Sequence, residues 1–155
     1  MKTIKILAVG QIKEPHWQKA ASHYQKRLGH TAKLDLHTIK DAPAKLPAEA
    51  RMEHESERLA ALVKPTDVTI CLDDTGRNLT SKEFASFLQS LYDYGATPCF
   101  MVGGAYGLSP SLKKQTRHII SLSPMTFTHE MAFVILLEQL YRTEMILLGT
   151  GYHHG

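Results

Sequence analysis

The sequence predicts an α/β fold in which a mostly parallel sheet is flanked by helices. Short apolar runs rich in β-branched residues alternate along the chain with longer helical segments, a pattern typical of parallel sheets covered on both faces. The 155 residues, 43% hydrophobic and 21% charged, are enough to bury one sizeable core. Because no internal repeat, low-complexity tract or linker divides the chain, we expect a single domain over residues 1–155.

Proline and glycine mark the elements of the first half. Pro15 is a favoured first-turn residue and Gly29 a helix stop, so a helix is expected between them. Apolar and polar residues alternate at residues 32–37, which predicts a half-exposed strand. The predicted order is a buried strand at 4–9, a helix at 15–28, a strand at 32–37, a surface loop at 40–47, a charged helix at 47–63, a strand at 68–72 and a turn at 73–78.

The second half follows from similar signals. Thr80 and Glu83 form a capping box that starts a helix, and Gly95 follows its end. The predicted order is a helix from Thr80 to Tyr92, a strand at 99–102, a short helix at 110–116, a short strand at 118–122 and a long helix at 129–148.

The long helix is apolar on nearly every side. One sheet face cannot bury such a helix, so either a second layer of the same chain or a second copy must cover it. A homodimer is the simpler expectation.

Membrane and secretion signals are missing from the pattern. No apolar stretch reaches the length that spans a bilayer, and the first residues run directly into a strand rather than a signal peptide. Cys71 and Cys99 lie inside apolar runs without metal or redox spacing, which predicts buried free thiols. We therefore expect a cytoplasmic protein that does not associate with membranes.

Positive charge is concentrated at the start of the chain. Residues 1–33 hold seven Lys and Arg residues against one acidic residue, Glu14. Such a segment is either a solvated face or a phosphate-contacting surface for nucleic acid, and charge alone does not decide between them.

A glycine turn and a pair of carboxylates follow two of the predicted strands. Gly103, Gly104 and Gly107 lack the spacing of the dinucleotide fingerprint, but glycines at a strand end let a backbone approach a ligand. A plain turn is the alternative. Asp73 and Asp74 suit a metal, a ribose hydroxyl or an ordinary turn, and no third ligand nearby supports a metal site.

Titratable side chains lie on the long helix and in the tail. His129, His153 and His154 lack zinc-ligand spacing, so a proton-handling role is favoured over a metal, and simple solvation is favoured for His154. Arg142 lies four residues after Glu138, which favours an intrahelical ion pair over an anion-binding role.

Six short motifs occur in the order in which one enzyme family carries them. They are Leu72-Asp73-x-x-Gly76, Ser81-x-Glu83-Phe84, Gly103-Gly104-x-x-Gly107-Leu108-Ser109, Leu122-Ser123-x-Met125-Thr126-x-x-His129, Glu138-Gln139-Leu140-Tyr141-Arg142 and Tyr152-His153. This ordered set and the chain length resemble the ribosomal RNA large-subunit methyltransferase H family, minimal members of the SPOUT class of S-adenosylmethionine (SAM) enzymes.

The resemblance implies a deep trefoil knot in the C-terminal third and a homodimer whose knots meet at the interface. It implies SAM as methyl donor, no metal, and a partner, 23S ribosomal RNA within the ribosome, that is methylated at N3 of a pseudouridine. The residues implied to cradle SAM are Leu72, Gly103, Gly104, Leu122, Ser123, Pro124, Met125, Thr126 and Phe127.

The same resemblance directs the chemistry to four residues. N3 must lose its proton before it attacks the methyl group, and either His129 or His153 is expected to accept that proton. Arg142 is expected to stabilise negative charge on the neighbouring carbonyl oxygens, and Tyr152 is expected to stack on the base.

Two departures from the family pattern leave alternatives open. Phe133 and His154 stand where the family usually carries Arg. The alternatives are a SPOUT enzyme of another RNA specificity and a non-catalytic RNA-binding module, for which Phe133 is the main hint. A nucleotide-binding oxidoreductase or phosphotransferase is excluded because both of its glycine motifs are missing.

Overall fold

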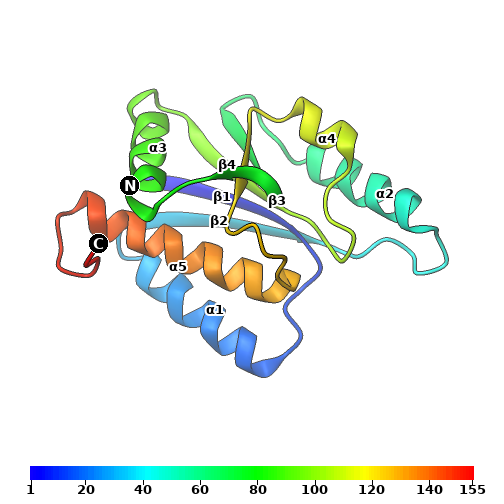
Figure 1. Ribbon diagram of the computed structural model, residues 1–155, viewed down its shortest axis with the longest axis horizontal. Helices are drawn as coiled ribbons and strands as arrows, with labels where there is room; N and C mark the ends of the chain where they lie inside the picture. The colour runs from blue at the N-terminus through cyan, green and yellow to red at the C-terminus, as the bar shows by residue number, and fades with distance from the viewer.

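The computed structural model describes all residues, 1–155, and confirms the predicted fold class. Five strands form one sheet in the order β2-β1-β4-β3-β5, and every neighbouring pair is parallel (Figure 1). The strands are β1 (Lys2–Val9), β2 (Ala32–Ile39), β3 (Asp67–Asn78), β4 (Thr97–Val102) and β5 (His118–Ser121).

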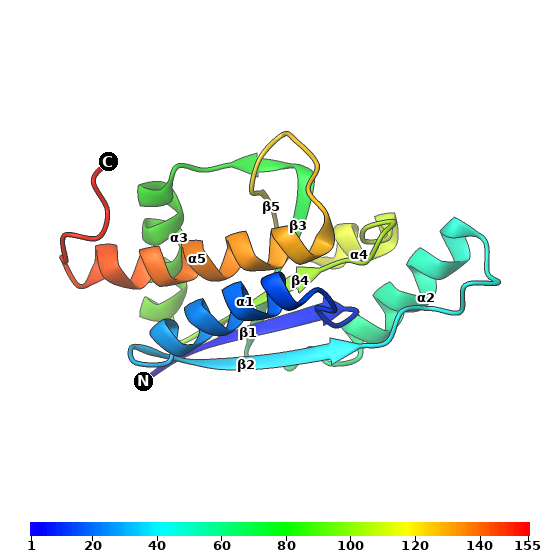
Figure 2. The same cartoon turned by 90° about the horizontal axis from the view of Figure 1, so that it is seen from below.

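Five helices connect the strands and cover both faces of the sheet. They are α1 (Pro15–Leu28), α2 (Ala48–Ala60), α3 (Ser81–Asp93), α4 (Pro110–Gln115) and α5 (His129–Leu147). One hydrophobic core lies between the sheet and α1, α3 and α5, and a smaller core lies under α2 and α4 on the opposite face (Figures 1 and 2). None of the helices is long and apolar enough to cross a membrane.

Several local predictions are confirmed. The helix α1 has the predicted bounds, and the capping box is complete: the Thr80 hydroxyl accepts from the Glu83 N–H at 3.1 Å, and the Glu83 carboxylate accepts from the Thr80 N–H at 2.7 Å. Cys71 and Cys99 are free and buried, and burial raises the pKa of the Cys99 thiol to about 12.

The predicted turn at residues 73–78 is wrong, because β3 continues through this segment. Ile120 of β5 faces both Leu72 and Arg77, so the residues between those two leave the ladder as a bulge. A Cβ added to Gly76 would lie 2.8 Å from the backbone of β5, so only glycine fits this close approach. The bulge therefore keeps the strand paired while it turns the two carboxylates out of the ladder.

The chain itself supplies the second layer that α5 needs. The helix packs against α1 and α3, and its residues Leu136, Leu137 and Leu140 are fully buried. Phe133 is only 5% exposed and belongs to this core, so it is a packing residue rather than a surface position that has lost a charge. The apolar character of α5 therefore does not by itself require a second copy.

Candidate active site

A cavity of about 560 Å³ lies beyond the carboxyl ends of β3 and β4, where ligands bind in open α/β sheets. We call it the strand-end cavity. Its walls are the β3 bulge, the glycine turn after β4, the loop after β5 and the first turns of α5.

Eight of the nine residues expected to cradle a cofactor line this cavity. They are Leu72, Gly103, Gly104, Leu122, Ser123, Met125, Thr126 and Phe127. Pro124 is exposed and does not line it. Sequence reasoning from the family pattern did not assign Tyr106, Thr128 or Ala132, which also line the cavity.

The glycine turn is too tight for side chains. A Cβ added to Gly103 would lie 2.6 Å from the carbonyl carbon of Gly107, and one added to Gly104 would lie 3.1 Å from the Glu55 carboxylate and from Val9. The Gly107 N–H donates to the Gly104 carbonyl at 3.0 Å, which closes the turn. The backbone can therefore approach a ligand at this wall of the cavity.

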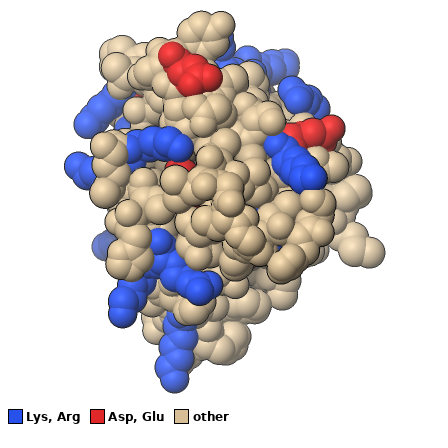
Figure 3. All heavy atoms as spheres, turned by 90° about the vertical axis from the view of Figure 1, so that its left-hand side faces the viewer, with Lys and Arg blue, Asp and Glu red and all other residues tan.

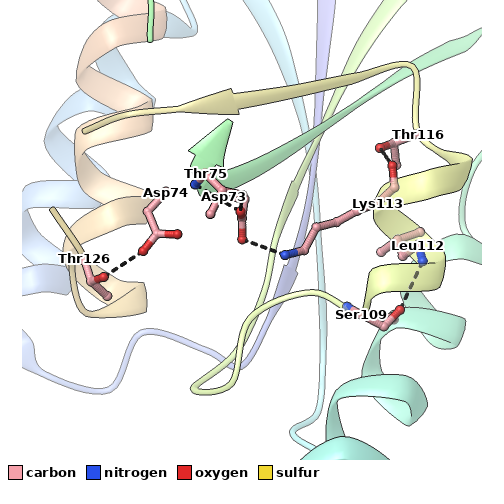
Figure 4. A network of polar contacts seen from close by, with 9 residues as sticks. Asp73, Asp74, Thr75, Ser109, Leu112, Lys113, Thr116 and Thr126 are labelled. Atoms are coloured by element: carbon pink, nitrogen blue, oxygen red, sulfur yellow. Dashed lines mark hydrogen bonds and ion pairs between the residues drawn. The ribbon is translucent and has the colours of Figure 1, made fainter. Parts of the chain in front are cut away.

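Two carboxylates of the β3 bulge hold neighbouring segments in place (Figure 4). Lys113 Nζ lies 3.1 Å from Asp73 Oδ1, and the Thr75 N–H and hydroxyl donate to Asp73 Oδ2. Burial alone would raise the pKa of Asp73, but the hydrogen bonds from Thr75 and Lys113 hold it below its ordinary value. Asp74 Oδ2 accepts from the Thr126 hydroxyl at 2.8 Å and so connects the bulge to the loop after β5.

His129 is half-buried at the start of α5 and lines the strand-end cavity. The preceding Thr128 caps the helix by accepting from the Met131 N–H at 3.4 Å, which fixes where the helix begins. His129 also borders a smaller cavity of about 270 Å³ between β1, α1 and α5. Its imidazole is therefore the titratable ring placed next to both spaces.

The other three expected catalytic residues gather around Glu138 at the far end of α5. Glu138 Oε1 accepts from Arg142 Nε at 3.1 Å, from Arg142 Nη2 at 2.7 Å and from the Tyr152 hydroxyl at 3.0 Å. Arg142 Nη1 lies 3.1 Å from His153 Nδ1. We call Glu138, Arg142, Tyr152 and His153 the tail cluster.

The hydrogen bonds of the tail cluster have two consequences. The predicted Glu138–Arg142 ion pair is confirmed, and these hydrogen bonds raise the pKa of the Arg142 guanidinium. Because a guanidinium can only donate, His153 Nδ1 must accept, and a neutral ring then carries its proton on Nε2. The role of Glu138 in holding the tail was not foreseen from the sequence, since spacing along a helix does not reveal contacts with a later segment.

The strand-end cavity and the tail cluster lie at opposite ends of one helix (Figure 2). At the helical rise of about 1.5 Å per residue, His129 and Arg142 are separated by about 20 Å along α5. The structure thus brings His129 together with the expected cofactor residues, and Arg142 together with Tyr152 and His153. Within one chain it does not unite the two groups.

The molecular face at the tail end is rich in positive charge. Lys26, Arg27 and Lys33 are exposed where α1 ends and β2 begins. Figure 3 shows Lys and Arg side chains predominating over Asp and Glu on this side of the molecule. The Arg27 guanidinium lies 5.0 Å from the centre of the Tyr141 ring, and the Arg142 guanidinium lies 4.7 Å from that of Tyr152. Cations and aromatic rings therefore alternate across this face.

The fold and its strand-end cavity are those of a known class of enzymes. A family model described as "Predicted SPOUT methyltransferase" matches residues 1–153, and the chain therefore belongs to the SPOUT methyltransferase family. Membership of this class implies the knotted C-terminal third that the sequence motifs led us to expect.

Similar proteins narrow the comparison. The chain is 50% identical over 155 residues to the ribosomal RNA large subunit methyltransferase H of Nitratidesulfovibrio vulgaris (strain DP4), with 99% of each chain covered. It is 47% identical to the protein of the same name from Oleidesulfovibrio alaskensis, over 99% of this chain and 100% of that one. A solved probable methyltransferase from Bordetella pertussis Tohama I shares the fold, with a TM-score of 0.56 at 16% identity over 92% of this chain and 96% of that chain.

Proposed function

We propose that this chain is a SAM-dependent methyltransferase that methylates N3 of a pseudouridine in 23S ribosomal RNA on assembled ribosomes in the cytoplasm. The observation that carries the proposal is full-length identity of 50% to a ribosomal RNA large subunit methyltransferase H. The strand-end cavity, with its glycine turn, adds a site of suitable shape in the same chain.

We propose that SAM occupies the strand-end cavity, where it would supply an electrophilic methyl group. Leu72 and Phe127 would provide apolar walls, and the turn at Gly103 and Gly104 would let the backbone contact the ligand closely. The close contacts that a Cβ would make at Gly103 support a cradle built from backbone rather than from side chains.

His129 is our choice for the group that accepts the N3 proton. It lines the strand-end cavity, whereas His153 lies in the tail cluster and already accepts a hydrogen bond from Arg142 on Nδ1. A neutral His153 in this arrangement has no free lone pair for a second proton. His129 is therefore the better placed base.

A homodimer would unite the two groups of residues. Arg142 and Tyr152 of one copy cannot reach the cavity of the same copy across about 20 Å of helix. We propose that the tail cluster of one copy faces the strand-end cavity of the other, so that Arg142 stabilises charge on the base and Tyr152 stacks on it. The positive face around Lys26 and Arg27 would then contact RNA phosphates.

The test is methyl transfer from radiolabelled SAM to ribosomes from a strain that lacks the endogenous activity. Intact ribosomes, separated subunits and free 23S ribosomal RNA are compared, and the labelled nucleoside is identified. Label on N3 of pseudouridine in intact ribosomes is the expected result. Label on another nucleoside would indicate another RNA specificity, and no label with no SAM binding would indicate a non-catalytic RNA-binding module.

A further inference from the structure

The charge of the strand-end cavity is one-sided. Asp73 and Asp74 are among its lining residues, and no Lys or Arg is. Asp73 is balanced by Lys113 at 3.1 Å, and its side chain is only 14% exposed. Asp74 forms no ion pair, and its hydrogen-bond partner is the uncharged hydroxyl of Thr126. One uncompensated negative charge therefore remains at the wall of the cavity.

Methyl transfer changes the charge of the ligand that the proposed function places there. The bond between the methyl carbon and sulfur breaks, its electron pair stays on sulfur, and a bond forms between that carbon and the deprotonated ring nitrogen. The sulfonium cation thus becomes a neutral thioether. A carboxylate nearby attracts the donor more strongly than the product, because only the donor carries the sulfonium charge.

We propose that Asp74 makes the strand-end cavity distinguish the methyl donor from its demethylated product by charge, so that transfer itself weakens binding and favours product release. This inference rests on the proposed function, since it requires SAM in this cavity. It also gives Asp74 a role that differs from a metal ligand, a ribose contact or a turn residue.

The surroundings of Asp74 suit this role. The Thr126 hydroxyl, on the loop after β5, holds the carboxylate at 2.8 Å, and both residues line the cavity (Figure 4). Asp74 is exposed in the absence of a ligand, so solvent screening keeps the effect moderate. Asparagine has the same shape and keeps an oxygen that can accept from Thr126, which makes Asp74→Asn a substitution of charge alone.

The experiment is calorimetric titration of the wild type and three variants with SAM, with S-adenosylhomocysteine, and with a SAM analogue that carries a protonated amine in place of the sulfonium. Asp74→Asn removes the charge, and Thr126→Val removes the hydrogen bond but keeps the charge. Asp93→Asn is the matched control, because it changes net charge equally at the end of α3, on the side of the sheet away from the cavity. Thermal unfolding of each variant verifies that it is folded.

The wild type is expected to bind both cationic ligands more tightly than S-adenosylhomocysteine. Asp74→Asn should reduce this preference by about threefold to fivefold, as for the loss of an exposed ion pair. Asp93→Asn should leave the preference unchanged, and Thr126→Val should shift all three affinities by a common factor. If Asp74→Asn binds SAM with an unaltered preference, the inference is wrong. A wild type that binds none of the three ligands contradicts the proposed function and this inference with it.

Discussion

The two ends of α5 are built in different ways. The strand-end cavity at the start of the helix is formed largely by backbone, with a glycine turn that excludes side chains and loops fixed by short hydrogen bonds. The tail cluster at the other end consists of side chains gathered around one carboxylate, Glu138. The first is complete within one chain, and the second lies about 20 Å away along the helix. The difference suggests that donor binding and substrate handling can be altered separately.

The largest effect is expected from His129, which belongs to the cavity end. His129→Asn should slow single-turnover methyl transfer by about a hundredfold or more, because it removes the proposed proton acceptor. The SAM affinity should change little, since the cradle is backbone. His153→Asn is the matched comparison, and an equal or larger loss there would move the base to the tail cluster.

The glycine turn gives the next largest effect. Gly103→Ala places a Cβ 2.6 Å from the carbonyl carbon of Gly107, so the turn must shift and SAM affinity should fall by about tenfold or more. Gly104→Ala, whose Cβ meets its neighbours at 3.1 Å, should lose less. Gly151→Ala meets nothing within 4 Å and serves as the control. Calorimetric SAM titration measures all three, and equal affinities would show that the turn is not part of the cradle.

A loss confined to substrate handling is expected at Glu138. Glu138→Ala removes the acceptor shared by Arg142 and Tyr152, and methyl transfer should slow by about tenfold, the value of one or two charge-assisted hydrogen bonds. The SAM affinity should stay at the wild-type level because the cavity is distant. A parallel loss of SAM affinity would contradict the separation of the two ends.

The smallest effect concerns acid stability at the cavity end. The pKa of Asp73 lies below its ordinary value of 3.8, so its ionised form stabilises the folded state above that pH. This contribution is lost as the pH falls through the folded-state pKa. Urea unfolding of the wild type and Asp73→Asn between about pH 6 and pH 2 should show a gap in stability that closes in acid. A gap of constant size would mean that the charge of Asp73 is not its source.

Much of the fold was predictable because its signals are local. The capping box of Thr80 and Glu83 and the proline at the start of α1 depend on residues close in sequence, and both predictions are confirmed. The bulge in β3 was missed, because Asp-Asp-Thr-Gly is also good turn chemistry. Only its pairing with Ile120 of β5, far along the chain, keeps this segment in the sheet.

The candidate site shows the same limit. The glycine turn and the loop after β5 follow strands whose ends meet at one edge of the sheet, so their proximity follows from parallel topology. The contact between Glu138 and Tyr152 depends on the path of the tail, which no spacing rule describes. Phe133 was interpreted as a lost surface charge because burial within the packed layers of α1 and α5 cannot be seen from one helix alone.

Complementation between two inactive variants tests most directly whether the two ends of α5 act across copies. Protein mixed from His129→Asn and Tyr152→Phe chains would contain dimers in which one site has an intact cavity from one copy and an intact tail from the other. Random mixing should restore about a quarter of the wild-type methyl transfer, since half of the dimers are mixed and each carries one intact site. If the mixture stays at the average rate of the two separate variants, the tail cluster does not act on the cavity of a second copy.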